Sequence, residues 1–334
     1  MADVPAPAGS PPPGLVEIPP AEFGEYYFTR YGRRFPRHRL PPNERDEPII
    51  QQVQLPCILP VDSSEMQRRT VLHNLLHLRN NSHTFGPFDQ CMTPPENKVV
   101  LDIGSASGRW IEEVSEEWGH VPTFHGVEIV PRAATDIPRV VFEVYDFQRE
   151  AIRQGDATVD VVHARFQNFQ IIDWPCFLTD VARVLKPGGL FMSGECDLRL
   201  QYDNNDLQFP ATNHLYGRVT SFMNERGYTP NVGEAMRDML ATLPSPVDNT
   251  PLFHNIGSET INIPIGRNHP DSSQVELAAL AFESRERLAE SLTPFMLSCG
   301  LQGIEVNGLM TAHRHELNTE RAQMTYRMTW AQRR

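Results

Sequence analysis

The chain has 334 residues, enough for one large domain or two small ones. Its 30 basic and 42 acidic residues give a net charge of −12, which argues against a nucleic-acid substrate because phosphate binding needs a basic surface. No apolar stretch reaches transmembrane length, so we expect no membrane contact. The five cysteines form no CxxC pair and no metal-binding spacing, which indicates reduced thiols and a cytoplasmic location, with a nuclear one also open.

Residues 1–20 are rich in proline, alanine and glycine, so we expect them to be disordered. We treat residues 21–95 as an N-terminal extension. Within it, the basic segment Arg30–Arg39 is interleaved with aromatic residues, which predicts a solvated arm and is too interrupted for a nuclear targeting cluster. A helix is predicted from Ser63 to Leu78, with Asp62 or Ser63 as its N-cap.

The segment Val99–Arg109 is the most informative part of the chain. Apolar residues lead into an acid, a small-residue turn and a helical run from Trp110 to Trp118, which predicts a buried parallel strand, a tight loop and a helix N-terminus. Gly104 and Gly108 carry no Cβ, so a ligand can approach the backbone closely. The next strand ends at Glu128, where a carboxylate can bind both hydroxyls of a ribose. Together these elements predict a nucleoside-containing cofactor.

Two details favour S-adenosylmethionine (SAM) over NAD. The dinucleotide fingerprint needs glycine at the first, third and sixth loop positions, which here hold Gly104, Ala106 and Arg109. Asp102 precedes the loop, where a carboxylate would repel a pyrophosphate but attract the ammonium and sulfonium groups of SAM.

The rest of the chain continues to alternate strands and helices, which predicts an α/β fold with a doubly wound, Rossmann-like sheet of seven strands. Further strands are predicted at 140–147, 158–165, 189–195, 259–266 and 322–330, the last of them antiparallel. Helices are predicted at 173–185, within 209–243 and at 275–297, while the spacing in 301–317 fits a strand or a helix. Ligands of such sheets lie beyond the carboxyl ends of the strands.

The motifs resemble those of class I SAM-dependent methyltransferases. The resemblance rests on acid-x-Gly-x-x-x-Gly from Asp102, on the acidic end of the next strand, and on Arg183-Val-Leu-Lys-Pro-Gly-Gly-Leu. Shorter segments resemble the fungal LaeA-like branch of that class, namely Tyr26–Phe35, Leu40–Glu44, Arg68–His73, Val161–Arg165 and Ile263–Gly266.

This resemblance implies a SAM-binding domain over residues 96–332, with a helical substrate cover at about 205–250, and it favours a helix at 301–317. It implies that Asp146 and Phe147 flank the adenine, and that His73 and Arg69 approach the methionine carboxylate or close the site. The implied cofactor-binding set is Asp102, Gly104, Ser105, Gly108, Glu128, Asp146 and Phe147. The LaeA-like branch usually has glycine at the position of Ala106 in this loop. The methyl group that alanine adds is small enough to allow cofactor binding.

We expect no metal site. His313 and His315 are two residues apart, so on a helix they point in different directions, and we assign both to the surface.

Methyl transfer is a direct displacement, in which the protein aligns the acceptor and excludes water. A hydroxyl acceptor must also lose a proton, so a nearby base helps. His163 ends the fourth strand and is the candidate catalytic base, since imidazole titrates near neutrality. The competing interpretation is that His163 only hydrogen-bonds its own loop or positions Arg165. Glu195, at the end of the fifth strand, is the second candidate.

The sequence therefore predicts a SAM-dependent methyltransferase that acts on oxygen or nitrogen of a small secondary metabolite in a fungal pathway. Two alternatives stay open: a regulatory or protein-directed LaeA-like enzyme with nuclear partners, and a module that binds SAM without chemistry. No motif indicates a protein partner, and none names the acceptor.

Overall fold

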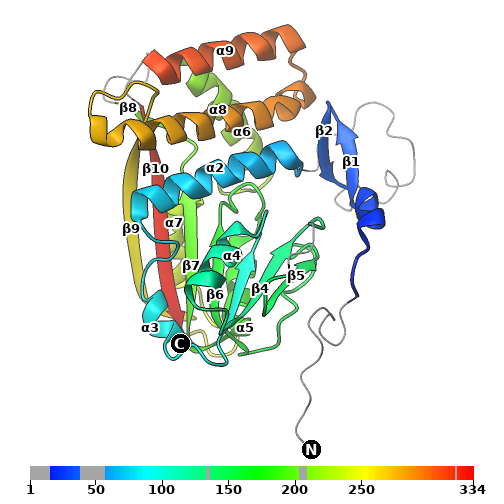
Figure 1. The fold of residues 1–334 in the computed structure, drawn as a ribbon, viewed down its shortest axis with the longest axis vertical. Helices are drawn as coiled ribbons and strands as arrows, with labels where there is room; N and C mark the ends of the chain where they lie inside the picture. Colours follow the sequence, from blue (N-terminus) through cyan, green and yellow to red (C-terminus); the bar gives the residue numbers. More distant parts are fainter. Residues whose placement is uncertain (1–15, 38–56, 133–135, 203–208, 320–321) are drawn as a thin grey trace, which may run out of the picture.

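The computed structural model describes residues 16–37, 57–132, 136–202, 209–319 and 322–334 (Figure 1). The predicted disorder of residues 1–15 and the segment Leu40–Glu44 lie outside these residues.

The centre of the molecule is a twisted sheet with strand order β5-β4-β3-β6-β7-β10-β8, and β9 pairs with β10. Pairing is parallel from β5 to β7 and antiparallel around β10, which confirms the doubly wound α/β prediction and the antiparallel last strand. The strands are β3 (Val99–Ile103), β4 (Thr123–Glu128), β5 (Val140–Val144), β6 (Val159–Arg165), β7 (Leu185–Cys196), β8 (Gln201–Tyr202), β9 (Phe253–Ile265) and β10 (Ala322–Arg333).

Two details of the sheet differ from the prediction. The two-residue strand β8 adds an eighth strand to the predicted seven, because a pair this short carries no readable hydrophobic pattern. Strand β7 begins at Leu185, directly after a helix, and so starts four residues before the strand predicted at 189–195.

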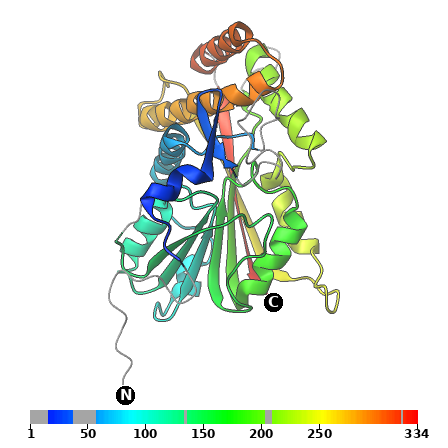
Figure 2. The same ribbon diagram turned by 90° about the vertical axis from the view of Figure 1, so that its right-hand side faces the viewer.

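Helices cover both faces of this sheet (Figure 2). On one face, α3 (Phe88–Met92) and α4 (Arg109–Glu117) bury Phe88, Trp110 and Ile111 against Val100 and other strand residues. On the other face lie α5 (Trp174–Val184) and α7 (Val232–Thr242). Asp173 caps α5, as predicted, by accepting a hydrogen bond from the Cys176 amide at 2.9 Å.

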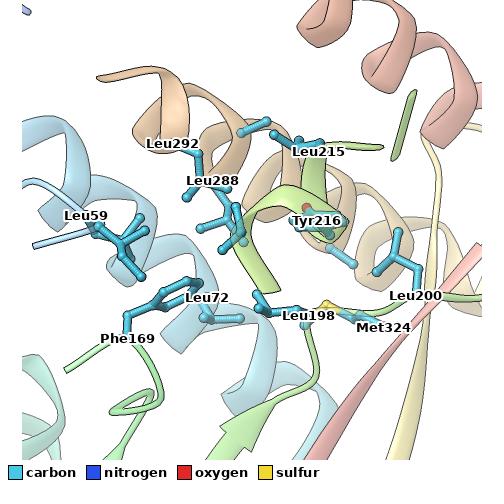
Figure 3. Close-up of a cluster of buried hydrophobic side chains, with 14 of the residues drawn as sticks. Leu59, Leu72, Phe169, Leu198, Leu200, Leu215, Tyr216, Leu288, Leu292 and Met324 are labelled. Atoms are coloured by element: carbon cyan, nitrogen blue, oxygen red, sulfur yellow. The ribbon is translucent and has the colours of Figure 1, made fainter. Parts of the chain in front are cut away.

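Four further helices form a layer across the edge of the sheet where the parallel strands end (Figure 1). They are α2 (Ser63–Asn80), α6 (Pro210–Glu225), α8 (Val275–Ser298) and α9 (Gly303–Thr319), and α9 confirms the helix that the resemblance favoured. Their apolar faces share a core with the ends of the strands, part of which is shown in Figure 3. None of the helices in the described ranges is long and apolar enough to cross a membrane.

The N-terminal extension packs against the body of the molecule. After η1 (Pro20–Tyr26), β1 (Tyr27–Arg30) and β2 (Arg33–Pro36) form an antiparallel hairpin. Phe28 and Phe35 of this hairpin are buried, and Arg33 pairs with Asp62, the N-cap of α2, at 2.6 Å. The predicted solvated arm is therefore wrong at Phe35 and Pro36, which are buried at the end of β2, while Tyr31, Arg34 and Arg37 are exposed.

The prediction that His313 lies at the surface is also wrong. One face of α9 packs on α6, so His313 is buried with Nδ1 2.8 Å from Thr212 Oγ1, while His315 is exposed. Glu316, from the same face, accepts hydrogen bonds from the Ala211 and Thr212 amides at the start of α6. Burial, together with the charge of Arg285, lowers the pKa of His313 to about 4.

The lowered pKa of His313 predicts that the folded protein loses stability in acid. A folded-state pKa below the unfolded value means that the contribution to stability is complete above about pH 6.5 and is lost as pH falls towards 4. As the pH falls from 7 to 5, His313 binds a proton in the unfolded state but not in the folded state. The free energy of unfolding should therefore fall by about 1–2 kcal/mol over this range. His313→Gln should flatten this part of the pH profile in urea titrations, whereas His214→Gln, at an exposed site on α6, should not. An unchanged slope in His313→Gln would contradict the assignment.

Candidate cofactor site

The glycine-rich loop between β3 and α4 is held tightly against the end of β4. The amides of Gly104 and Ser105 donate to the Val127 carbonyl at 2.9 and 3.0 Å. Gly104 and Gly108 have φ of 73° and 75°, a left-handed conformation that favours glycine. The two predicted glycines are thus needed for the loop's backbone shape.

Glu128 ends β4 and fixes the centre of the same loop. Its Oε2 accepts a hydrogen bond from the Ala106 amide at 2.7 Å, and its Oε1 accepts one from the Ile129 amide at 2.8 Å. Ala106 has φ of 52°, which costs a residue with a Cβ about 1–2 kcal/mol. The charge-assisted bond to Glu128 offsets this strain.

Two cavities border the loop and meet at Ala106 and Ser107. The hairpin cavity has a volume of about 170 Å³ and lies between Glu128, the β1–β2 hairpin and the start of α2. The loop cavity, of about 40 Å³, lies on the other side of the loop. The loop cavity is lined by Arg69, His73, Asp102, Gly104, Ser105, Ala106, Ser107, Arg109, Trp110, His163, Arg165 and Phe166.

Asp102 and His163 form a buried pair at this cavity. They are register neighbours on the parallel strands β3 and β6, and His163 Nδ1 lies 2.8 Å from Asp102 Oδ1. Trp110 stacks on the imidazole at 3.8 Å between ring centroids. Burial lowers the pKa of His163 and outweighs the opposing effect of Asp102. The carboxylate places the proton of the neutral ring on Nδ1, so the lone pair is on Nε2, which is buried and has no hydrogen-bond partner.

A chain of hydrogen bonds lies beside this pair. Arg165 Nη2 donates to His73 Nδ1 at 2.9 Å, His73 Nε2 lies 2.6 Å from Glu113 Oε2, and Arg109 Nε donates to Glu113 Oε1 at 2.7 Å. Burial and the Arg165 charge lower the pKa of His73 to about 3. His83 brings a third possible metal ligand within 4.8 Å of those of His73 and Glu113. Because hydrogen bonds already occupy both nitrogens of His73 and both oxygens of Glu113, this chain accounts for the cluster.

Four predicted residues, Gly108, Asp146, Phe147 and Glu195, are not among those that line these cavities. Asp146 and Phe147 follow β5, where Asp146 accepts from the Gln148 amide at 3.2 Å and Phe147 packs on Phe177, so their contact with adenine stays a prediction. Glu195 is buried and accepts hydrogen bonds from the Gln167 and Asn168 amides at 2.8 and 3.3 Å. Burial raises the pKa of Glu195 to about 8. Both of its oxygens hold the turn after β6, and its place outside both cavities argues against a role as the base.

Several residues at the site were missed from the sequence. The Gln167 side chain lies over Gly104, and the Arg132 guanidinium lies over Gly108 and pairs with Glu112 at 2.7 Å. Phe166 lines the loop cavity and also a third cavity, which we call the α8 cavity. Phe166 has φ of 60°, a strained value for an aromatic residue that often marks a functional position. Its position directly after a strand end was the only available signal.

The α8 cavity lies between α2, α8 and the ends of β6 and β7. Leu72, Leu198, Leu288 and Met324, all labelled in Figure 3, give it an apolar wall. The complete lining is Arg68, Leu72, Phe166, Asn168, Phe169, Cys196, Leu198, Ser284, Arg285, Leu288 and Met324.

The residues around the loop fit SAM by their chemistry. The Asp102 carboxylate in the loop cavity suits an ammonium group, and Glu128, beside the hairpin cavity, suits ribose hydroxyls. Ala106 and Ser107 line both cavities, so these two carboxylates lie beside the same short segment of the loop. The site has no nest of amides facing a pyrophosphate, since the Gly104 and Ser105 amides donate to Val127.

Comparison with known families agrees with this assignment. Residues 61–230, just over half of the chain, match the family described as a methyltransferase domain. The chain belongs to this methyltransferase family. The match spans α2, the glycine-rich loop, β4 to β7 and α6, so it includes the predicted cofactor residues.

Curated relatives of this methyltransferase come from fungi. It is 29% identical over 259 residues to the secondary metabolism regulator laeA of Coprinopsis cinerea, covering 75% of this chain and 62% of that protein. It is 24% identical over 245 residues to the protein-methionine methyltransferase laeA of Emericella nidulans, covering 71% and 61%. The chain thus spans about three fifths of these relatives' length. Among solved structures, phosphoethanolamine N-methyltransferase 2 of Haemonchus contortus with SAM matches at 16% identity and a TM-score of 0.41, covering 71% of this chain and 49% of that one.

Glu128 offers a direct test of the cofactor site. Glu128→Ala should weaken SAM binding about 10- to 100-fold, or about 1.5–3 kcal/mol, because it removes charge-assisted hydrogen bonds to two hydroxyls and frees the loop at Ala106. Isothermal titration calorimetry measures the change. Glu116→Ala, at an exposed position on α4, is the matched control and should bind SAM normally. Normal affinity in Glu128→Ala would place the ribose elsewhere.

Proposed function

We propose that the chain is a SAM-dependent methyltransferase that methylates oxygen or nitrogen of a small secondary metabolite. Membership in the methyltransferase family supports the reaction type. The observation that carries the proposal is the loop cavity, where Asp102, His163 and the glycine-rich loop meet next to the α8 cavity. Only Phe166 is common to the walls of both cavities, so a donor in one and an acceptor in the other would meet there.

The residues have separate tasks in this mechanism. Asp102 and Glu128 bind and orient the cofactor, while Trp110 and Asp102 hold the His163 ring in place. When bound, SAM supplies the methyl group and takes up the electron pair of the broken carbon–sulfur bond. The acceptor hydroxyl gives its proton to His163 Nε2, and an oxygen lone pair forms the new bond to carbon.

A small acceptor is favoured because the α8 cavity has a free volume of only about 30 Å³ and lies between α2 and α8 with a largely apolar wall. We further propose a cytoplasmic location, which is supported by the five cysteines, since none of them forms a disulfide with another described residue. The second candidate is a protein-directed enzyme, since one relative is named a protein-methionine methyltransferase. For that activity, a single side chain would have to enter between α2 and α8.

One experiment separates these functions. The protein is titrated with SAM and with NAD, and then incubated with methyl-labelled SAM and, separately, a fungal metabolite extract or the protein fraction of the same extract. We expect micromolar SAM affinity, no NAD binding, and label in the metabolite fraction. Label only in protein would establish the second candidate, comparable NAD affinity would refute the cofactor assignment, and SAM binding without any transfer would indicate a binding module.

A further inference from the structure

Arg285 is a buried cation at the α8 cavity. It lies in the middle of α8, is 2% exposed and lines the cavity. Its Nη2 donates to the Asp197 backbone carbonyl at 2.9 Å, and its Nε is buried without a hydrogen-bond partner. Its guanidinium carbon lies 5.9 Å from the centre of the Tyr216 ring.

The carboxylates around this cavity are committed to other groups. Glu65 forms a two-point ion pair with Arg68, the other arginine in the cavity wall, with bonds of 2.6 and 2.8 Å. The Asp197 carboxylate pairs with Arg327 at 3.0 Å, and Glu195 holds two backbone amides. Within the described residues, no carboxylate forms an ion pair with Arg285.

A buried arginine without a counter-ion costs several kcal/mol in general, so its retention calls for an explanation. The acceptors that it meets, the Asp197 carbonyl and the Tyr216 hydroxyl, are both uncharged, so the guanidinium has no charged hydrogen-bond acceptor. A planar guanidinium binds a carboxylate through two parallel hydrogen bonds, which compensates the charge. The free volume of the cavity, about 30 Å³, suits a group the size of one or two waters, such as a carboxylate.

We propose that the α8 cavity recognises the carboxylate of an apolar organic acid, and that Arg285 is the specificity-determining residue for this acceptor. The inference rests on the proposed function. Leu72, Leu198 and Leu288 contact the apolar part of the acid, and Phe166 separates its carboxylate from the cofactor side of the site. Because the free volume is small, these side chains move apart to admit the rest of the molecule.

The first test uses benzoate as the probe and benzamide as its uncharged analogue, each titrated calorimetrically into the full chain with saturating S-adenosylhomocysteine. We expect benzoate to bind at least tenfold more tightly than benzamide. Equal affinities would overturn the proposal. This comparison needs no variant, so it does not depend on how well a mutant folds.

The second test uses Arg285→Met, with Arg287→Met as the control on the same helix, where Arg287 pairs with Glu283 at the surface at 2.8 Å. Arg285→Met should lose benzoate binding at least tenfold, keep its SAM affinity, and melt at the same or a higher temperature because an uncompensated charge is removed. A lower melting temperature with unchanged benzoate binding would show that Arg285 is structural and overturn the proposal.

The labelled products separate this inference from the proposed function. With the wild-type protein, the labelled metabolites should derive from carboxylic acids, and Arg285→Met should label them at least tenfold more slowly. Labelled products from neutral acceptors only would overturn the carboxylate assignment and leave the methyltransferase proposal intact. Absence of SAM binding would refute the proposed function, while the benzoate titration, repeated without S-adenosylhomocysteine, would still report on Arg285.

Discussion

Gly104→Val is expected to abolish detectable SAM binding while circular dichroism shows a retained fold. Gly104 has φ of 73°, a conformation that valine adopts only with strain. A Cβ at this position would also meet the Gln167 side chain, whose Nε2 donates to the Arg165 carbonyl at 2.8 Å. The substitution therefore disturbs both the loop and the wall of the loop cavity. Calorimetry with SAM measures the loss.

Gly188 provides a matched control for backbone strain. It lies near the start of β7 with φ of 77°, and the space around an added Cβ is open. Gly188→Val should therefore bind SAM with wild-type affinity even if its melting temperature falls. If Gly104→Val does not fold, Gly104→Ala, which adds one carbon in the same place, repeats the test. A SAM dissociation constant equal to that of the wild type in the Gly104 variants would show that the loop does not contact the cofactor.

The sheet and the loop were predictable because their signals are local. Each parallel strand contains a short apolar run, and β3, β4, β6 and β7 carry an acid or a histidine near the carboxyl end, at one edge of the sheet. Residues Asp102, Glu128 and His163 were therefore placed correctly at that edge. Their pairing was not predictable, since it depends on the register that sets Asp102 opposite His163.

The residues missed at the site depend on contacts between distant segments. Arg285 meets Asp197 across 88 positions in the chain, and no local pattern connects α8 with the end of β7.

The basic segment after Arg30 was predicted to be solvated because its charges dominate the composition, but alternate residues of a strand face opposite ways, which buries Phe35. For the same kind of reason, the spacing of His313 and His315 should have placed one of them inward.

His163→Ala is expected to lower kcat by about 10²–10⁴ while SAM affinity stays within a few-fold of wild type, because the variant removes a base and leaves Asp102 and the loop in place. The acceptor identified from the extract is needed for this measurement. With a hydroxyl acceptor, the deficit should shrink as pH rises, since the acceptor then ionises without help. His214→Ala, at an exposed position on α6, serves as the control and should show the wild-type pH profile.

The outcome distinguishes a catalytic base from a residue that belongs to the cofactor site. If kcat falls, the deficit shrinks at high pH and SAM affinity is kept, then His163 Nε2 is the base, and Asp102 fixes the tautomer that exposes its lone pair. If SAM affinity falls and the turnover of the bound complex does not, His163 instead positions Asp102 for the cofactor. A small effect at every pH would mean that the acceptor atom, such as a neutral amine, needs no base. Glu195 is not placed to replace His163 in that role, because it lines neither the loop cavity nor the α8 cavity.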